Sequence, residues 1–143
     1  MITFDEMKYP AVYIRFEGNN FYPSKLKEKT NYPIKVLAEY GEISTKGRYK
    51  GKPSPYGMGV IEIQTNNHHE NIYNIIKKYI SELLKKKADL KESGVEEIVF
   101  DIEASKDFTT EISISADILK DLSLLNAQVT FHTINDTESL KIN

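Results

Sequence analysis

The sequence predicts an α+β domain with a mixed, mostly antiparallel sheet and helices on one face. Residues 11–17 alternate between apolar and polar side chains, and residues 70–92 repeat apolar side chains at helical spacing. Strand-like and helix-like segments follow one another in the order β-α-β-β-α-β-β-α-β. The first six elements have the order of a ferredoxin-like core. Because each helix has one apolar stripe, we expect a two-layer sandwich with an exposed sheet face.

Three strands and a short helix are expected in the first half of the chain. The strand over residues 11–17 has an apolar face made of Val12, Ile14 and Phe16. A Phe-Tyr-Pro-Ser segment then begins a Lys-rich helix, which Asn31 and Pro33 end. Residues 34–43 and 60–65 are the next strands. Since only a loop rich in glycine and proline joins them, we expect an antiparallel hairpin with a long tip.

The longest helix is expected over residues 70–92. Its apolar face is formed by Ile72, Ile76, Tyr79, Ile80, Leu83, Leu84 and Leu90. Asn67 precedes it in the position of a capping box, and Gly94 follows where a left-handed cap is expected. Lys85, Lys86 and Lys87 complement the helix dipole near its end.

The last four elements are two strands, a helix and a final strand. The first strand covers residues 97–104, and its polar face carries Glu97, Val99, Asp101 and Glu103. A short strand follows in the EISIS segment, residues 111–115. Ser115 caps the next helix, and residues 127–134 form the last strand.

Composition narrows the class of protein. At 143 residues the chain fits a single domain, residues 1–143, and its lack of cysteine excludes disulfides, thiolate metal sites and thiol nucleophiles. No apolar stretch approaches the roughly 20 residues that cross a bilayer, and the acidic start of the chain does not resemble a secretory signal. We therefore expect a cytoplasmic protein. Basic residues are in excess over residues 1–60 and acidic residues over 61–143, so the molecule is polar in charge unless the fold mixes the halves.

The order of several turns and strands resembles one bacterial family. A strand, the FYPSKL helix start, a proline-containing entry into the next strand and the loop KGRYKGKPSPYGMG follow one another. Over residues 11–134 this arrangement is similar to the family catalogued as domain of unknown function 4279. The resemblance implies a small cytosolic bacterial domain with no assigned reaction, of a kind sometimes suspected to be an immunity protein beside a secreted toxin.

The loop over residues 46–59 is the main candidate for a binding site. Its basic residues and its two tyrosines, Tyr49 and Tyr56, are interleaved, but it lacks the Gly-Lys-Ser/Thr ending of a phosphate-binding loop. The plainer interpretation is a solvated hairpin tip. If a partner exists, we expect the loop to be mobile in the free protein and to contact that partner through Arg48, Tyr49, Lys52 and Tyr56.

Metal and catalytic chemistry have little support. His68 and His69 are neighbours in a helix, where side chains point about 100° apart and cannot share one ion without distortion. His132 is on a distant strand, and no serine lies in a Gly-x-Ser-x-Gly elbow. Glu97, Asp101 and Glu103 could do acid–base work in a cleft, but they are more typical of a solvated strand face. We expect no catalytic residue, metal or cofactor.

Three functions remain open at this point. The first is a non-catalytic module that binds a macromolecule, such as a toxin, through the exposed sheet face or the loop. The second is an enzyme or small-molecule binder with a pocket between sheet and helices. The third is RNA binding through the Lys/Tyr loop, which the acidity of the chain opposes.

Overall fold

The computed structural model of the protein describes residues 11–64, 72–105 and 114–134. They contain five strands and four helices, which confirms the α+β class. In chain order the elements are β1 (Ala11–Gly18), α1 (Pro23–Thr30), β2 (Lys35–Ala38), β3 (Gly57–Gln64), α2 (Ile72–Lys85), α3 (Lys87–Ser93), β4 (Glu97–Ser105), α4 (Ala116–Leu124) and β5 (Ala127–Ile134).

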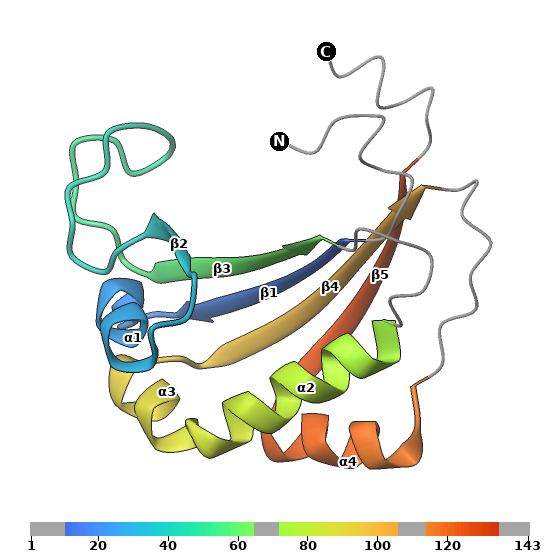
Figure 1. The fold of residues 1–143 in the computed structure, drawn as a ribbon. Helices are drawn as coiled ribbons and strands as arrows, with labels where there is room; N and C mark the ends of the chain where they lie inside the picture. Colours follow the sequence, from blue (N-terminus) through green and yellow to red (C-terminus); the bar gives the residue numbers. More distant parts are fainter. Residues whose placement is uncertain (1–10, 65–71, 106–113, 135–143) are drawn as a thin grey trace.

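The five strands form one mixed sheet in the order β2-β3-β1-β4-β5. Neighbouring strands are antiparallel except β4 and β5, which are parallel. The predicted hairpin is confirmed, because β2 and β3 pair in antiparallel directions on either side of the long loop. All four helices lie on one side of the sheet, and no described helix covers the other side (Figure 1). No helix in the described ranges is long and apolar enough to span a bilayer.

The core lies between the sheet and the helices. β1 is the central strand, and its predicted apolar face of Val12, Ile14 and Phe16 is fully buried. The helices contribute Leu26, Ile72, Ile76, Ile80, Leu83, Leu90, Ile118 and Leu122. Since side chains alternate along a strand, the polar residues of β1 are left on the side that no described helix covers.

The single long helix predicted over residues 70–92 is wrong, because the chain forms two helices there. Lys86 separates them, and its N–H donates to the carbonyl of Leu83 at 3.0 Å. Periodicity missed the break since Leu83 and Leu90 would share a face in a continuous helix too. The predicted cap at Gly94 is confirmed, with a φ of 98°. The predicted capping box of Asn67 lies outside the described residues.

The second strand is shorter than predicted. β2 covers Lys35–Ala38 instead of residues 34–43, because the chain turns soon after it. The Glu42 N–H donates to the Glu39 carbonyl at 3.2 Å, and Gly41 adopts a φ of 80° that favours glycine.

The remaining boundaries agree more closely. β3 begins at Gly57 instead of Val60, because the residues before Val60 still pair with β1. Of the predicted short strand over 111–115, residues 111–113 lie outside the described ranges and the rest is not a strand. Ser115 caps α4 as predicted, since its side chain accepts a hydrogen bond from the Ile118 N–H at 3.3 Å.

Candidate functional site

We call the side of the sheet that no described helix covers the open face. Alternation, strand register and the lining of a shared hollow place residues of all five strands on it, including Tyr13, Arg15 and Glu17 of β1, Lys35 and Leu37 of β2, Met58, Val60 and Glu62 of β3, Glu97, Val99, Asp101 and Glu103 of β4, and Gln128, Thr130 and His132 of β5. The prediction that the acids of β4 share one face is therefore confirmed.

The open face carries more acidic than basic side chains. Its carboxylates come from three strands and belong to Glu17, Glu62, Glu97, Asp101 and Glu103. Among the described residues of this face, only Arg15 and Lys35 carry a permanent positive charge. Between these charges, Val60 and Val99 flank Arg15 in the register and are buried. The surface thus carries an excess of negative charge around Arg15, which lies between two buried valines.

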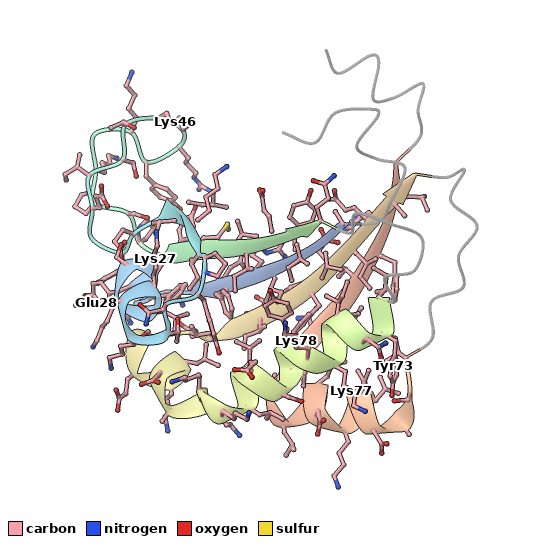
Figure 2. All side chains as sticks on the ribbon, in the orientation of Figure 1. Lys27, Glu28, Lys46, Tyr73, Lys77 and Lys78 are labelled. Carbon is pink, nitrogen blue, oxygen red and sulfur yellow. The ribbon has the colours of Figure 1, made fainter. Side chains whose placement is uncertain are left out.

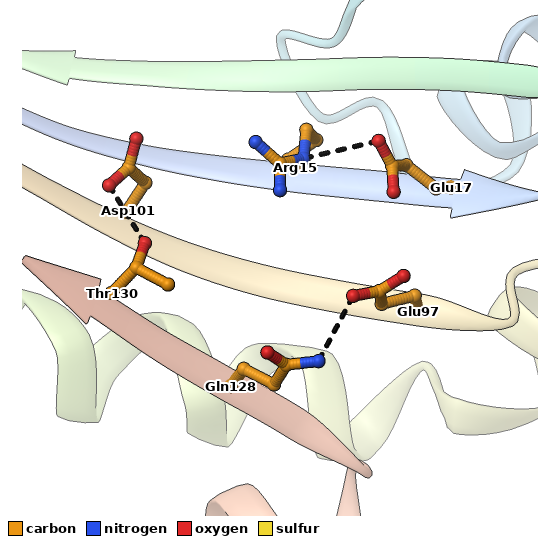
Figure 3. Close-up of polar contacts among 6 residues, drawn as sticks. All are labelled: Arg15, Glu17, Glu97, Asp101, Gln128 and Thr130. Atoms are coloured by element: carbon orange, nitrogen blue, oxygen red, sulfur yellow. Dashed lines mark hydrogen bonds and ion pairs between the residues drawn. The ribbon is translucent and has the colours of Figure 1, made fainter.

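Polar contacts hold several of these side chains in place (Figure 3). Gln128 donates to Glu97 at 3.0 Å and Thr130 donates to Asp101 at 2.8 Å, so β5 orients two carboxylates of β4. Arg15 Nε lies 3.3 Å from Glu17 Oε1 as an ion pair, with no aligned hydrogen-bond acceptor among the described residues. The acids are therefore positioned but only partly neutralised.

The open face changes the proton affinity of two side chains. Burial raises the pKa of Tyr13 from 10.0 to about 12, and the carboxylates of Glu103, Glu62 and Asp101 raise it in the same direction. Burial also raises the pKa of Glu103; the negative charge of Asp101 adds to this shift, whereas His132 opposes it. Both shifts indicate that this surface disfavours additional negative charge.

Two hollows lie side by side on the open face and share Met58. The first, which we call the sheet hollow, has a volume of about 340 Å³ and contains Tyr13, Arg15, Glu62 and Asp101 in its lining. The second, which we call the loop groove, has a volume of about 690 Å³. It lies between the loop and the adjoining strand ends, and its lining is Glu17, Gly18, Asn19, Tyr49, Pro55, Tyr56, Met58, Glu96 and Glu97.

Glycines position the strand ends that border the loop groove. Gly18 at the end of β1 pairs with Gly57 at the start of β3. A Cβ atom on Gly57 would lie 2.0 Å from the carbonyl oxygen of Phe21, and one on Gly18 would lie 2.2 Å from that of Gly94. Because only glycine allows these close approaches, the three backbone segments meet tightly beside the groove.

The loop itself is organised by main-chain hydrogen bonds. Ser44 donates to the Lys52 carbonyl at 3.0 Å, and Gly51 donates to the Ser44 carbonyl at 2.8 Å. Ser54 is buried and donates through Oγ to the Tyr56 carbonyl at 2.7 Å. These bonds give the loop a defined path next to the strands, while its mobility stays a prediction.

The predicted loop residues have different positions. Tyr49 and Tyr56 come together in the loop groove, with ring centroids 6.3 Å apart in an edge-to-face arrangement. The Arg48 guanidinium lies 5.7 Å from the centroid of Tyr49, but Arg48 is not among the lining residues. Lys52 is exposed, contacts Ser44 through its main chain and does not line the groove either. Lys46 extends from the loop tip (Figure 2).

Sequence reasoning missed the partners of the two tyrosines. Glu17 and Glu96 lie on other segments, and no spacing in the chain connects them with the loop. The available signal was the polar face of the first strand, where Glu17 follows Arg15. Only the pairing of β1 with both β3 and β4 brings these residues together.

The described residues offer no metal site, and His132 is the one histidine among them. The described ranges contain no group of three or more His, Asp or Glu residues that could hold a metal ion. His132 is exposed, and its Nε2 lies 3.1 Å from Asp101 Oδ1. His68 and His69 lie outside the described residues.

Comparisons with protein-family models, with curated proteins and with solved structures find no match for this chain.

Proposed function

We propose that this protein is a non-catalytic module that binds a basic segment of a protein partner on its open face. The observation that carries the proposal is the acidic, partly apolar surface with two adjacent hollows that no described helix covers. Aromatic and methionine side chains give contact area at protein interfaces, while charge complementarity increases the association rate and the specificity. An immunity protein that neutralises a basic toxin is one protein of this type.

The strand order supports a further proposal about the fold. We infer that β1 to β4 with their helices form a ferredoxin-like core within a two-layer sandwich, to which α4 and β5 are added. The order β2-β3-β1-β4 with antiparallel neighbours favours this interpretation. The resemblance to the domain of unknown function 4279 family stays a prediction, and the binding proposal depends only on the residues of the open face and the loop.

RNA binding is less consistent with the site. The loop carries Lys46, Arg48, Lys50 and Lys52, which could neutralise phosphates. The loop groove beside it, however, is lined by three carboxylates and by no lysine or arginine in the described residues. A phosphate backbone that followed the tyrosines would meet this negative charge, so we favour a cationic protein segment.

A small molecule is the second candidate, on one observation. The loop groove, at about 690 Å³, falls within the roughly 300–1,000 Å³ range of small-molecule sites. It lies at the strand ends beside the loop, not between sheet and helices as the sequence suggested. A thermal-shift screen of metabolites, repeated with Tyr56→Ala, would reveal a ligand that depends on this groove.

Photo-crosslinking in the source cells tests the proposal directly. A photoreactive amino acid replaces Glu62 on the open face, and a matched variant carries it at Glu28, which is exposed on α1 (Figure 2). We expect Glu62 to crosslink to one protein through a peptide rich in lysine or arginine, and Glu28 not to. Crosslinks to RNA, or the same products from both positions, would contradict the proposal.

A further inference from the structure

The loop groove contains carboxylates that the fold places opposite one another. In the register of β1 and β4, Glu17 faces Glu97 directly, and such antiparallel pairs have Cβ atoms about 4.5–5.5 Å apart. Glu96 adds a third carboxylate to the lining. Like charges directly opposite one another in a sheet are destabilising. The described lining contains no lysine or arginine that would compensate them.

Each of these carboxylates has only part of its hydrogen-bonding capacity in use. Glu96 accepts from the Asn19 N–H at 2.6 Å, Glu97 accepts from Gln128 at 3.0 Å, and Glu17 pairs with Arg15. An ionised carboxylate offers about four acceptor positions. A cation with several N–H donors could therefore bind more than one of them without displacing the existing contacts.

The lining of the groove also contains aromatic side chains. Tyr49 and Tyr56 form an edge-to-face pair, and Met58, next to Glu17 in the register, adds a polarisable apolar side chain. Arg48 places its guanidinium within cation–π distance of Tyr49, so this ring already interacts with a positive charge. The lining of the groove thus combines aromatic side chains with carboxylates that are only partly compensated.

We propose that the loop groove binds an arginine side chain of the protein partner. This inference rests on the proposed function and names the chemistry of the partner at this site. A guanidinium is planar, can stack on a tyrosine ring and can donate two parallel hydrogen bonds to a carboxylate. A lysine ammonium is a compact, strongly hydrated charge and uses the aromatic side chains less well. Arginine therefore matches both the aromatic side chains and the carboxylates of the groove.

The test uses acetyl-Gly-Arg-Gly-amide as the probe in an NMR titration of the full chain. We expect shift changes at Tyr49, Tyr56 and Glu97, and at least fivefold weaker binding of the matching lysine and citrulline peptides. Tyr56→Phe keeps the ring and should retain binding, whereas Tyr56→Leu should weaken it at least fivefold. Glu28→Gln on α1 is the control and should bind like the unmodified protein.

Glu97→Gln separates binding from stability. It removes one of the two facing charges yet keeps an oxygen that can accept from Gln128, so the melting temperature should rise by about 1–3 °C while peptide affinity falls. A fall in both the melting temperature and the peptide affinity would contradict the proposed role of the facing charges. Equal binding of the lysine or citrulline peptide, or shifts confined to other surfaces, would overturn the arginine site. If the arginine site fails in the titration but Glu62 still crosslinks to a protein through a basic peptide, the proposed function stands. If the groove selects arginine but Glu62 gives no such crosslink, only the proposed function is contradicted.

Discussion

Tyr13 and Glu103 show how the open face acts on individual ionisable side chains. Glu103 has its pKa raised above 4.5 because burial and the charge of Asp101 disfavour its ionised form. When the pKa of an acid is higher in the folded protein than in the unfolded chain, the protein loses stability as the pH rises through the folded pKa. Glu103→Gln should therefore stabilise the protein at pH 7, and this gain should disappear below about pH 4. Urea unfolding of the unmodified protein and of Glu103→Gln at both pH values measures this gain in unfolding free energy. A gain that persists at low pH would show that ionisation of Glu103 is not its cause.

The phenol of Tyr13 makes a second prediction at alkaline pH. Its pKa is about 12 in the folded protein against 10.0 for an unperturbed tyrosine, so the neutral phenol is favoured by folding. The stability associated with it is complete below pH 10 and is lost as the pH rises through about 12. Relative to Tyr13→Phe, the unmodified protein should lose unfolding free energy across this window. The other tyrosines contribute equally to both proteins, so their effect cancels in the difference. Parallel curves of unfolding free energy against pH would show that Tyr13 does not cause the loss.

At the scale of the elements, Gly57 tests how the strand ends are joined. Replacement by alanine would place a Cβ 2.0 Å from the Phe21 carbonyl oxygen, so backbone must move. We expect Gly57→Ala to lower the unfolding free energy by about 3 kcal/mol. Gly47→Ala is the comparison, because its Cβ meets nothing within 4 Å and only its φ of 81° costs roughly 1–2 kcal/mol. If denaturant unfolding shows the same loss of unfolding free energy for Gly57→Ala and Gly47→Ala, the close approach of Gly57 to the Phe21 carbonyl does not cause the destabilisation.

The buried face of α2 makes a further prediction at this scale. Ile76 is fully buried, so Ile76→Asp places an unpaired carboxylate in the core and should cost several kcal/mol. Lys78→Asp changes an exposed position on the same helix and should leave the melting temperature within a few degrees. Similar melting temperatures for both variants would contradict the orientation of α2.

Patterns local to one element were predictable from the sequence, and patterns that depend on strand pairing were not. Alternation identified β1 and β4 because the apolar residues on one face of each are buried. It identified β5 because polar residues recur on one of its faces. The break at Lys86 left no trace in the periodicity. The loop tyrosines were found by composition, but their neighbours Glu17 and Glu97 required the register of β1 and β4. Sequence alone could therefore predict the aromatic side chains of the groove but not its carboxylates.

On the scale of the whole molecule, the sheet keeps the two halves of the chain largely apart. The order β2-β3-β1-β4-β5 groups β1 and β2 of the basic first half with β3, which spans the boundary between the halves, and places β4 and β5 of the acidic second half beside them. The basic loop therefore adjoins an acidic surface. Association with a basic partner should weaken as salt is added, since exposed charges are screened beyond about 8 Å at physiological ionic strength.

The loop provides the last prediction, because it should be dispensable for folding but needed for binding. Tyr49 and Tyr56 are half-buried and contact each other, and neither belongs to the hydrophobic core cluster. The path of the loop is set by main-chain hydrogen bonds and by buried Ser54, which a change of these side chains preserves. Replacing Arg48, Tyr49, Lys52 and Tyr56 together by alanine should shift the melting temperature by only a few degrees.

The same variant should bind the crosslinked partner at least tenfold more weakly, about 1.4 kcal/mol, in a titration with the purified proteins. Replacement of Lys27 and Glu28 by alanine, both exposed on α1, is the control and should leave affinity unchanged. Loss of folding in the fourfold variant would show that the tyrosines support the core. Unchanged affinity would place the partner on the sheet hollow around Asp101, where Glu62→Lys would then be the substitution that weakens binding.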